Sequence, residues 1–393
     1  MRVTKALASR ITAAALFALV LLPVLATSAA AATPRVGRAR ALSTNTIGTR
    51  ANREIDAWAA WLKANGAKGL VGEVGWPSDD PRWNTVANSW LTRADAAGIG
   101  VTTWVAGEWS SSMQLSGYGR SSYAVKSLDT ANSNAIVAEG HFATSTEMRG
   151  VNGTGPEMGA AANEPTSSFS NVNYGSVDHT YHYDSAESYA FLAARGVRTV
   201  RLPFRWERVQ RTLFGALDTD EMSRLGAAVH AAHAAGLQVV LDLHNFAGYY
   251  LADPVTGLGV RQTIGSAGLP INAFTDVWAK LANYFAGDTA VSAFDIMNEP
   301  IGMAARGRVP ASRVWEQASQ QAVNVIRATG DTRTLMVAGY EWSSMANWTR
   351  NHPVSWIKDP ANNFRYEAHE YFDALHTGVY RSYDEEVHAI TAR

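Results

Sequence analysis

The sequence predicts a (β/α)8 barrel. Five times, a stretch with helical spacing ends in glycine and runs into a strand-like segment, and three further strand-like segments bring the total to eight. Glycine just past a helix closes the last turn in the left-handed conformation, and alternating helices and strands indicate a parallel sheet. An open doubly wound sheet is the competing architecture, but the sequence lacks its glycine-rich phosphate fingerprint.

The glycines that end the five expected helices are Gly66, Gly98, Gly196, Gly236 and Gly330. The expected strands cover residues 69–73, 100–104, 148–152, 197–200, 237–241, 291–297, 335–337 and 364–369. Within the expected helix 52–65, Ile55, Trp58 and Leu62 fall on one face, as in an amphipathic helix. The pair Asp184 and Glu187 has the spacing of a capping box and predicts the start of the helix that ends at Gly196.

The amino-terminal residues predict an export signal. Residues 1–32 combine a basic start, an apolar run and the small residues Ala30–Ala32, which is the pattern of a cleaved signal peptide. A retained membrane anchor is the alternative, but the apolar run is short for a span. Residues 33–50 are basic and lack periodicity, so we expect a flexible arm, and residues 51–393 form the expected barrel domain.

Composition narrows the class of protein. The chain has 393 residues, 47% hydrophobic and 18% charged, with a formal net charge of −1, so nothing in it favours nucleic acid or an anionic membrane as a partner. It contains no cysteine, which excludes disulfides and thiolate chemistry. The 13 Trp and 14 Tyr mostly fill the core, but many stand where aromatic rings could stack on sugars.

Polar and aromatic side chains stand where the expected strands end. Barrel enzymes carry their active sites at the carboxyl ends of the strands. Each residue has a structural alternative: a core histidine, a helix start, a structural ion pair or a turn cap. Their joint occurrence predicts a functional site, and its members are Glu73, Trp104, Asn152, Arg201, His244, Asn298, Glu299, His369 and Tyr371.

These segments resemble glycoside hydrolase family 5, the cellulase-like barrel glycosidases. The resemblance covers nearly the whole chain after residue 50. The matching segments are residues 200–207 (VRLPFRWE), 241–245 (LDLHN), 294–300 (FDIMNEP), 368–373 (AHEYFD), 72–75 (GEVG) and 103–107 (TWVAG).

The resemblance implies a role for each site residue. It implies that Glu299 is the general acid/base and Glu73 the nucleophile, with Arg201 orienting Glu73 and holding it ionised. The remaining roles that it implies are contact with the sugar 2-hydroxyl for Asn298, a polar shell for His244, His369 and Tyr371, and a sugar platform for Trp104. The chemistry agrees, since retaining hydrolysis needs two carboxyl groups in different protonation states.

The order of the segments departs from the family pattern. In that pattern the nucleophile and Trp strands come seventh and eighth, whereas here they come first. We therefore expect a circularly permuted barrel: residues 51–110 carry family strands seven and eight, residues 111–147 join them, and residues 148–393 carry family strands one to six. A fusion of parts of two tandem barrels and a segment swap between two chains are the alternatives.

The expected function is that of a secreted retaining endo-β-glycosidase acting on β-1,4-glucan. The protein is expected to be a monomer that needs no cofactor. The alternatives are β-mannan or another β-glucan as substrate, a non-catalytic carbohydrate-binding barrel and a structural adhesion protein.

A metal site is not expected, and the pairs His230/His233 and His179/His182 are interpreted as surface residues. Carboxylates ranked below the main pair are Glu108, Glu157, Glu341 and Glu370, and further aromatic candidates for sugar stacking are Trp76, Trp109, Trp206, Tyr249 and Trp342.

Overall fold

The computed structural model describes residues 46–143, 145 and 147–392. The expected signal peptide, residues 1–32, lies outside the described residues. None of the helices in the described part is long and apolar enough to span a membrane.

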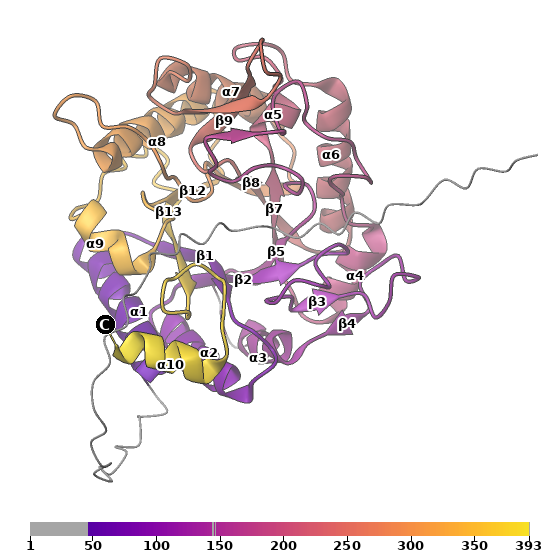
Figure 1. The fold of residues 1–393 in the computed structure, drawn as a ribbon, viewed down its shortest axis with the longest axis vertical. Coiled ribbons are helices and arrows are strands. Elements are labelled where there is room, and N and C mark those ends of the chain that lie inside the picture. Colours follow the sequence, from indigo (N-terminus) through magenta and orange to yellow (C-terminus); the bar gives the residue numbers. More distant parts are fainter. Residues whose placement is uncertain (1–45, 144, 146, 393) are drawn as a thin grey trace, which may run out of the picture. The chain divides into compact units, whose positions relative to one another are not determined.

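Eight parallel strands close into a barrel, as predicted (Figure 1). Each pairs with its neighbour in chain order, and the first strand pairs with both the second and the last, which closes the circle. The barrel strands are β1 (Gly69–Gly75), β2 (Gly100–Ala106), β5 (Arg149–Gly153), β7 (Thr199–Phe204), β8 (Gln238–Leu243), β11 (Val291–Asp295), β12 (Thr334–Ala338) and β13 (Phe364–Tyr371). All eight expected strands are therefore confirmed, with ends that differ by a few residues.

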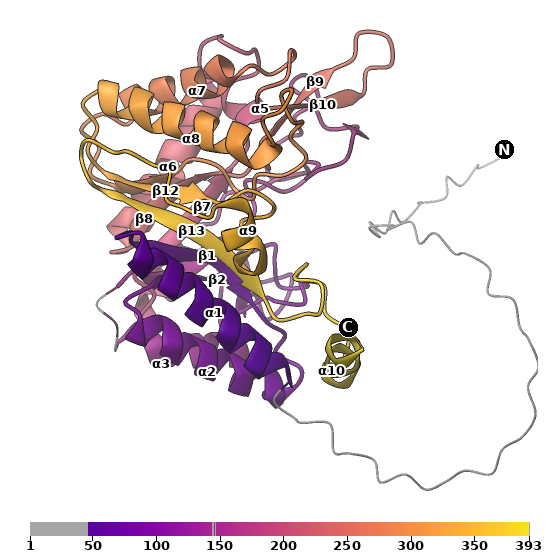
Figure 2. The same cartoon turned by 90° about the vertical axis from the view of Figure 1, so that its left-hand side faces the viewer.

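Helices surround the barrel on its outside (Figures 1 and 2). The longer ones are α1 (Thr46–Ala64), α2 (Pro81–Ala96), α3 (Ser133–Phe142), α4 (Ala186–Ala194), α6 (Thr219–Ala234), α7 (Ile271–Tyr284), α8 (Ala311–Ala328) and α10 (Tyr383–Thr391). The short ones are α5 (Trp206–Val209), α9 (Trp348–Asn351) and the 3-10 turn η1 (Met345–Asn347). The five glycines expected after helices all have positive φ, between +61° and +92°, which confirms that prediction.

Five short strands of the described part lie in the loops that follow the carboxyl ends of barrel strands. These are β3 (Tyr118–Gly119), β4 (Thr130–Ala131), β6 (Thr166–Ser167), β9 (Gly248–Ala252) and β10 (Gly259–Thr263). Figure 2 shows the β9–β10 hairpin and α10 on the side toward which β13 runs. Figure 1 views the barrel from this end.

Two boundaries differ from the sequence prediction. The expected arm reached residue 50, but α1 begins at Thr46, because Ile47 and Ala51 are buried against the barrel. Arg50 also donates to the carbonyls of Phe372 and Asp373, at 2.8 and 3.0 Å, which holds the first turns of the helix in place. The expected joining segment contains α3, which packs on α2 and β5 as a regular barrel helix.

The predicted cap of α4 is also corrected. Ser185 is the N-cap, and its hydroxyl accepts from the backbone N–H of Ser188. Asp184 instead accepts a hydrogen bond from the backbone N–H of Glu108, at 2.9 Å, in a different loop. Asp184 and Ser185 are both common N-cap residue types, but only Asp184 has a Glu three residues later, so the spacing favoured the wrong one of the two.

A layer of apolar side chains lies inside the barrel beneath the polar ends. Leu70, Val240, Ala293 and Met336 form this separate buried cluster. Val240 and Ala293 stand two residues before Asp242 and Asp295, so they face the same side of their strands. The barrel interior therefore changes from apolar to charged as the strands approach their carboxyl ends.

Candidate active site

Glu73 lies near the end of β1 and is almost fully buried, with 3% of its surface exposed. One of its oxygens, Oε1, lies 3.1 Å from Nη1 of Arg201. The other, Oε2, accepts a hydrogen bond of 2.7 Å from the Tyr371 hydroxyl and lies 3.4 Å from Nδ1 of His369. Donors from β7 and β13 therefore fix both oxygens of this carboxylate.

Arg201 projects from β7 into the centre of four carboxylates. Its Nε lies 2.7 Å from Asp295, its Nη1 3.0 Å from Asp242, and its Nη2 3.3 Å from Glu367, and Glu73 completes the set. Burial alone would lower the pKa of Arg201, but these carboxylates hold it well above its usual value. The guanidinium is thus a fixed cation that connects β1, β8, β11 and β13.

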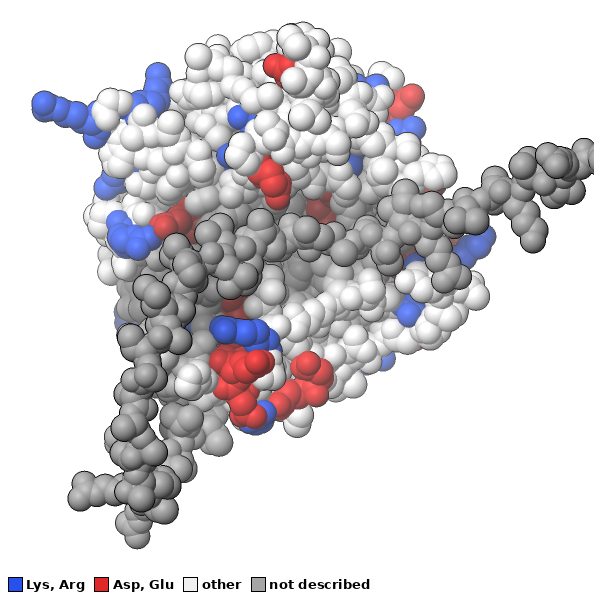
Figure 3. All heavy atoms as spheres, in the orientation of Figure 1, with Lys and Arg blue, Asp and Glu red and all other residues white. Residues whose placement is uncertain are grey.

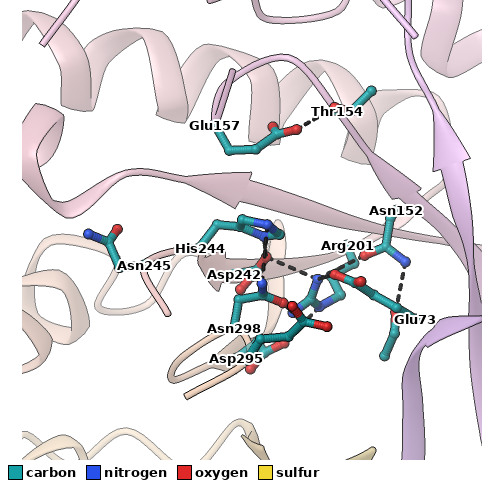
Figure 4. A network of polar contacts seen from close by, with 12 residues as sticks. Glu73, Asn152, Thr154, Glu157, Arg201, Asp242, His244, Asn245, Asp295 and Asn298 are labelled. Atoms are coloured by element: carbon teal, nitrogen blue, oxygen red, sulfur yellow. Dashed lines mark hydrogen bonds and ion pairs between the residues drawn. The ribbon is translucent and has the colours of Figure 1, made fainter. Parts of the chain in front are cut away.

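Two amides complete the surroundings of Arg201 (Figure 4). Asn152 accepts from Nη1 at 2.8 Å and donates to the Gly72 carbonyl at 2.7 Å. Asn298 accepts from Nη2 at 2.9 Å and donates to Nε2 of His244 at 3.1 Å. Both side chains are therefore held by hydrogen bonds at each end.

His244 is held in its neutral form. Its Nδ1 lies 2.7 Å from Asp242, and its Nε2 accepts from Asn298. Burial lowers the pKa of His244 to about 4. The hydrogen-bond pattern requires the proton on Nδ1, so Nε2 can only accept.

Glu299 follows β11 and is more open to solvent than Glu73, with 14% of its side chain exposed. Its Oε1 lies 2.8 Å from Nδ1 of His369, whose Nε2 lies 3.1 Å from Glu367. Burial raises the pKa of Glu299 to about 7, against the opposing effect of His369. Near neutral pH this carboxyl group can therefore both donate and accept a proton.

Glu73 and Glu299 come together across the barrel, although 226 positions separate them in the chain. Both approach the same nitrogen of His369, and one oxygen of each lies within 4.8 Å of the other. This pair and His369 also form a set of possible metal ligands. However, both His369 nitrogens face carboxylates and its pKa is raised well above normal by them, against burial, so the imidazole acts as a proton donor here.

Trp104 completes the group of predicted residues. Its ring stacks on that of His244, with centroids 6.1 Å apart and planes 24° from parallel, and it stays partly exposed. Among the other aromatic candidates, Trp76, Trp206 and Tyr249 are buried in the core and cannot contact a sugar. Trp109 and Trp342 are half-buried.

The lower-ranked carboxylates contact other partners than the pair Glu73 and Glu299. Glu370 points to the other face of β13 from His369, toward Glu54 of α1, and burial raises its pKa to about 8. Glu341 pairs with Arg350 and accepts from Asn351. Glu157 accepts from Thr154 and from the backbone of Gly155.

The prediction for the histidine pairs is correct for one pair and half wrong for the other. His230 and His233 are exposed, as is His179. His182 is only 18% exposed at its side chain and lies 2.7 Å from both Glu108 and Asp178. Glu108 in turn accepts from Ser185 and Ser188 of the α4 amino terminus, which a pattern of histidine spacing alone cannot reveal.

Sequence reasoning missed Asp242, Asp295 and Glu367. A signal was present, since Asp242 stands two residues before His244 and Glu367 two before His369. Residues at this spacing in a strand share a face, so these carboxylates had to enter the barrel as well. Gly72 makes room for Glu367, because a Cβ atom at this position would lie 1.6 Å from Oε1 of Glu367.

A closed (β/α)8 barrel with two carboxyl groups facing each other at the carboxyl ends of its strands defines the class of barrel glycoside hydrolases. Residues 159–390, more than half of the chain, match the family described as cellulase (glycosyl hydrolase family 5). The chain belongs to glycosyl hydrolase family 5.

Several relatives within the family are endoglucanases. The chain is 29% identical over 220 residues to the manganese-dependent endoglucanase Eg5A of Phanerodontia chrysosporium, covering 54% of this chain and 52% of that one. It is 28% identical over 204 residues to endo-β-1,4-glucanase B of Emericella nidulans, covering 51% and 56%. The chain thus spans about half the length of these curated relatives.

The chain is also similar to an endoglucanase of known structure. The endoglucanase Cel5A of Pseudomonas stutzeri, crystallised with cellobiose, is 30% identical to this chain. The similarity covers 61% of this chain and 68% of that one, with a TM-score of 0.50.

Proposed function

We propose that the protein is a retaining endo-β-1,4-glucanase. The observation that carries the proposal is the pair Glu73 and Glu299, joined through His369, with one oxygen of each within 4.8 Å of the other. Carboxyl groups about 5–5.5 Å apart are typical of retaining enzymes, whereas inverting enzymes leave a larger gap for a water molecule.

In the proposed reaction, Glu73 attacks the anomeric carbon while Glu299 gives its proton to the departing glycosidic oxygen. This forms a covalent glycosyl–Glu73 ester and releases the first product. Glu299, now ionised, accepts a proton from water, which attacks the same carbon and releases Glu73. Both carboxyl groups return to their initial protonation states, so the cycle is balanced and needs no cofactor.

The surrounding residues support these roles. Arg201 and Tyr371 fix the two oxygens of Glu73 in the orientation for attack. Asn298 is locked between Arg201 and His244, so its amide can bind a sugar hydroxyl at the reacting centre without further ordering. Trp104, still partly exposed beside His244, offers a flat apolar surface to the same sugar.

The proposed substrate class is a neutral β-1,4-glucan. The three relatives described above are named as endoglucanases, and one was crystallised with cellobiose. Figure 3 shows that most of the visible surface at this end of the barrel is uncharged, which suits a neutral polymer better than a polyanion. The signal-peptide pattern of residues 1–32 supports export to where such polymers occur.

The purified mature protein is expected to release reducing sugars from hydroxyethylcellulose, a neutral β-1,4-glucan, and less or none from mannan, laminarin and xylan. Glu299→Gln is expected to lower this activity about 10²–10⁴-fold, because general acid catalysis contributes that much. The measurement is reducing-sugar release on the four polymers. Binding to a polymer with no release from any of them would contradict the proposal and favour a carbohydrate-binding barrel.

The same assignment predicts how activity depends on pH. Glu299 must be protonated to act as the acid, and its pKa is about 7, so kcat/KM should fall as pH rises through 7. An aryl β-cellobioside with a good leaving group needs less protonation, and its kcat/KM should depend less on this group. Equal loss on both substrates above pH 7 would count against Glu299 as the acid.

We also infer that the barrel is circularly permuted relative to its family. The match to the family covers residues 159–390, so the segment with Glu73 and Trp104 lies outside it. In the barrel this segment stands between β13 and β5, where the last two strands of the family order belong. Figures 1 and 2 both draw α1 beside α10, so the ends of the described chain approach each other there.

A rearranged chain provides the test of this inference. It would begin at residue 111, run to residue 392 and continue through a short Gly/Ser linker into residues 46–110. Because these ends lie side by side, this chain should fold to the same barrel and keep hydrolysis within about tenfold. Circular dichroism and reducing-sugar release would measure this, and failure to fold with every linker length tried would contradict the permutation.

A further inference from the structure

A cavity in the described part of the chain lies in the loops that follow β2 and β5, and neither Glu73 nor Glu299 lines it. It measures about 640 Å³, and its lining is Glu108, Trp109, Ser111, Ser112, Arg120, Ser121, Ser122, Tyr123 and Met158. Every lining residue precedes residue 159, so the cavity is built entirely outside the segment that matches the family. A volume of this size is typical of small-ligand sites.

Trp109 forms a rigid wall of this cavity. Its indole ring stacks on the His182 imidazole, with centroids 5.1 Å apart and planes only 8° from parallel. His182 does not line the cavity, so it covers one face of the indole and leaves the remaining surface to the cavity. The half-buried indole is therefore held flat against a support, as a stacking platform requires.

The His182 imidazole is itself held in place through both of its ring nitrogens. Nε2 of His182 lies 2.7 Å from Glu108, and Nδ1 lies 2.7 Å from Asp178. Burial alone would lower the pKa of His182, but these two carboxylates raise it to about 8. Below that pH a cation therefore lies under the indole, which adds a cation–π attraction to the stacking.

The polar groups of the cavity suit a neutral ligand. Glu108 lines it, but its oxygens are already engaged by His182, Ser185 and Ser188. Arg120 is fixed through its backbone N–H to Ser111 and through Nη1 to the Val125 carbonyl, so its guanidinium is held at the edge of the cavity. An aromatic surface edged by hydroxyls and a guanidinium is the combination that binds a pyranose ring.

The loops that build the cavity follow two strands that also carry residues of the candidate active site. Trp109 lies in the loop just beyond β2, the strand that carries Trp104, and Met158 follows Glu157 in the loop after β5. Figure 4 draws Glu157 above His244, and its charge acts on the pKa of that histidine. A polysaccharide bound at the catalytic pair can therefore extend along this side of the barrel into the cavity.

We propose that this cavity is a distal glucan-binding subsite in which Trp109, positioned by His182, stacks on a glucosyl unit away from the cleaved bond. The inference rests on the proposed endoglucanase function. Because the subsite is remote from the reacting centre, it acts only on substrates long enough to reach it.

Trp109→Ala provides the test. It should lower kcat/KM on a soluble, neutral β-1,4-glucan such as hydroxyethylcellulose by about tenfold or more, since a stacked aromatic is a typical binding anchor. It should leave kcat/KM on a short aryl β-cellobioside within about twofold. Tyr284→Ala, which removes a half-exposed aromatic ring on α7, is the matched control and should change neither value.

Substitutions of His182 test whether it positions Trp109. His182→Gln should raise KM for the polymer while kcat on the aryl cellobioside stays unchanged, and His182→Arg, which restores a flat cation, should recover part of the loss. In the inactive Glu299→Gln background, Trp109→Ala should also weaken cellopentaose binding by calorimetry.

The outcomes separate the two proposals. Wild-type protein that cleaves neither polymer nor cellobioside would contradict the endoglucanase assignment itself. Normal hydrolysis that Trp109→Ala leaves unchanged on the polymer, or lowers equally on both substrates, would overturn the distal subsite alone. A preference for carboxymethylated over neutral glucan that depends on Arg120 would overturn the neutral ligand.

Discussion

Glu73→Ala is expected to lower hydrolysis of a soluble β-1,4-glucan by at least about 10⁴-fold, the largest effect of any single substitution in the chain. Glu73 is proposed to form the covalent bond to the sugar, and none of its neighbours can replace it. Tyr371 and Arg201 bind its oxygens but present donors, not a nucleophile. Steady-state rates on the polymer and on dinitrophenyl β-cellobioside measure the loss.

Rescue with azide distinguishes a nucleophile from a structural carboxylate. In Glu73→Ala, azide can occupy the vacated space and attack the anomeric carbon directly, so the product should be the α-glycosyl azide. In Glu299→Ala, Glu73 still forms the ester and azide then displaces it, so the product should be the β-glycosyl azide. Identical anomers from both variants would show that the two roles are wrongly assigned.

The barrel could be predicted from the sequence because its signals are local and repeated. Gly98 and Gly236 each end a helix in the left-handed conformation and are followed within a few residues by a buried strand. A local signal of this kind does not depend on the order of the units along the chain, since each helix–strand unit carries its own signal. The start of α1 was harder to locate, because its first turn is held by distant contacts such as that of Arg50 with Phe372.

The central carboxylates show where sequence reasoning stops. Glu73 and Glu299 could be predicted because they stand where expected strands end. Asp295 lies deeper inside the barrel. Its contact with Arg201 depends on how β7 and β11 face each other across the barrel. The Trp109–His182 stack likewise joins two loops 73 residues apart in sequence. Such contacts are set by the closed barrel and leave only weak traces, such as the alternation of Asp242 and His244.

The surroundings of Arg201 make it the residue on which the stability of this end of the barrel most depends. It is 1% exposed and lies within 3.3 Å of Glu73, Asp242, Asp295 and Glu367. Carboxylates cannot remain ionised in a buried site without a cation, because desolvation is costly. Burial already raises the pKa of Asp242 to about 7 and that of Asp295 well above normal, even with Arg201 present.

Arg201→Met is therefore expected to lower the free energy of unfolding by about 3–5 kcal/mol at pH 8, the cost of leaving buried charges unpaired. Raised carboxyl pKa values mean that the folded state holds protons that the unfolded state has lost. Stability of the variant should then fall as pH rises from the usual carboxyl pKa toward 7 and above. The deficit against wild type should consequently be smaller at pH 5 than at pH 8, as measured by urea denaturation.

Arg93→Met is the matched control, because it removes a surface partner of Asp56 whose side chain is 53% exposed. Solvent screens such a pair, so its loss should change the free energy of unfolding by less than about 1 kcal/mol at either pH. If Arg201→Met behaved like this control, the four carboxylates would not depend on the guanidinium. The carboxyl ends of the strands would then be stable as neutral acids, and the fixed orientation of Glu73 would need another source.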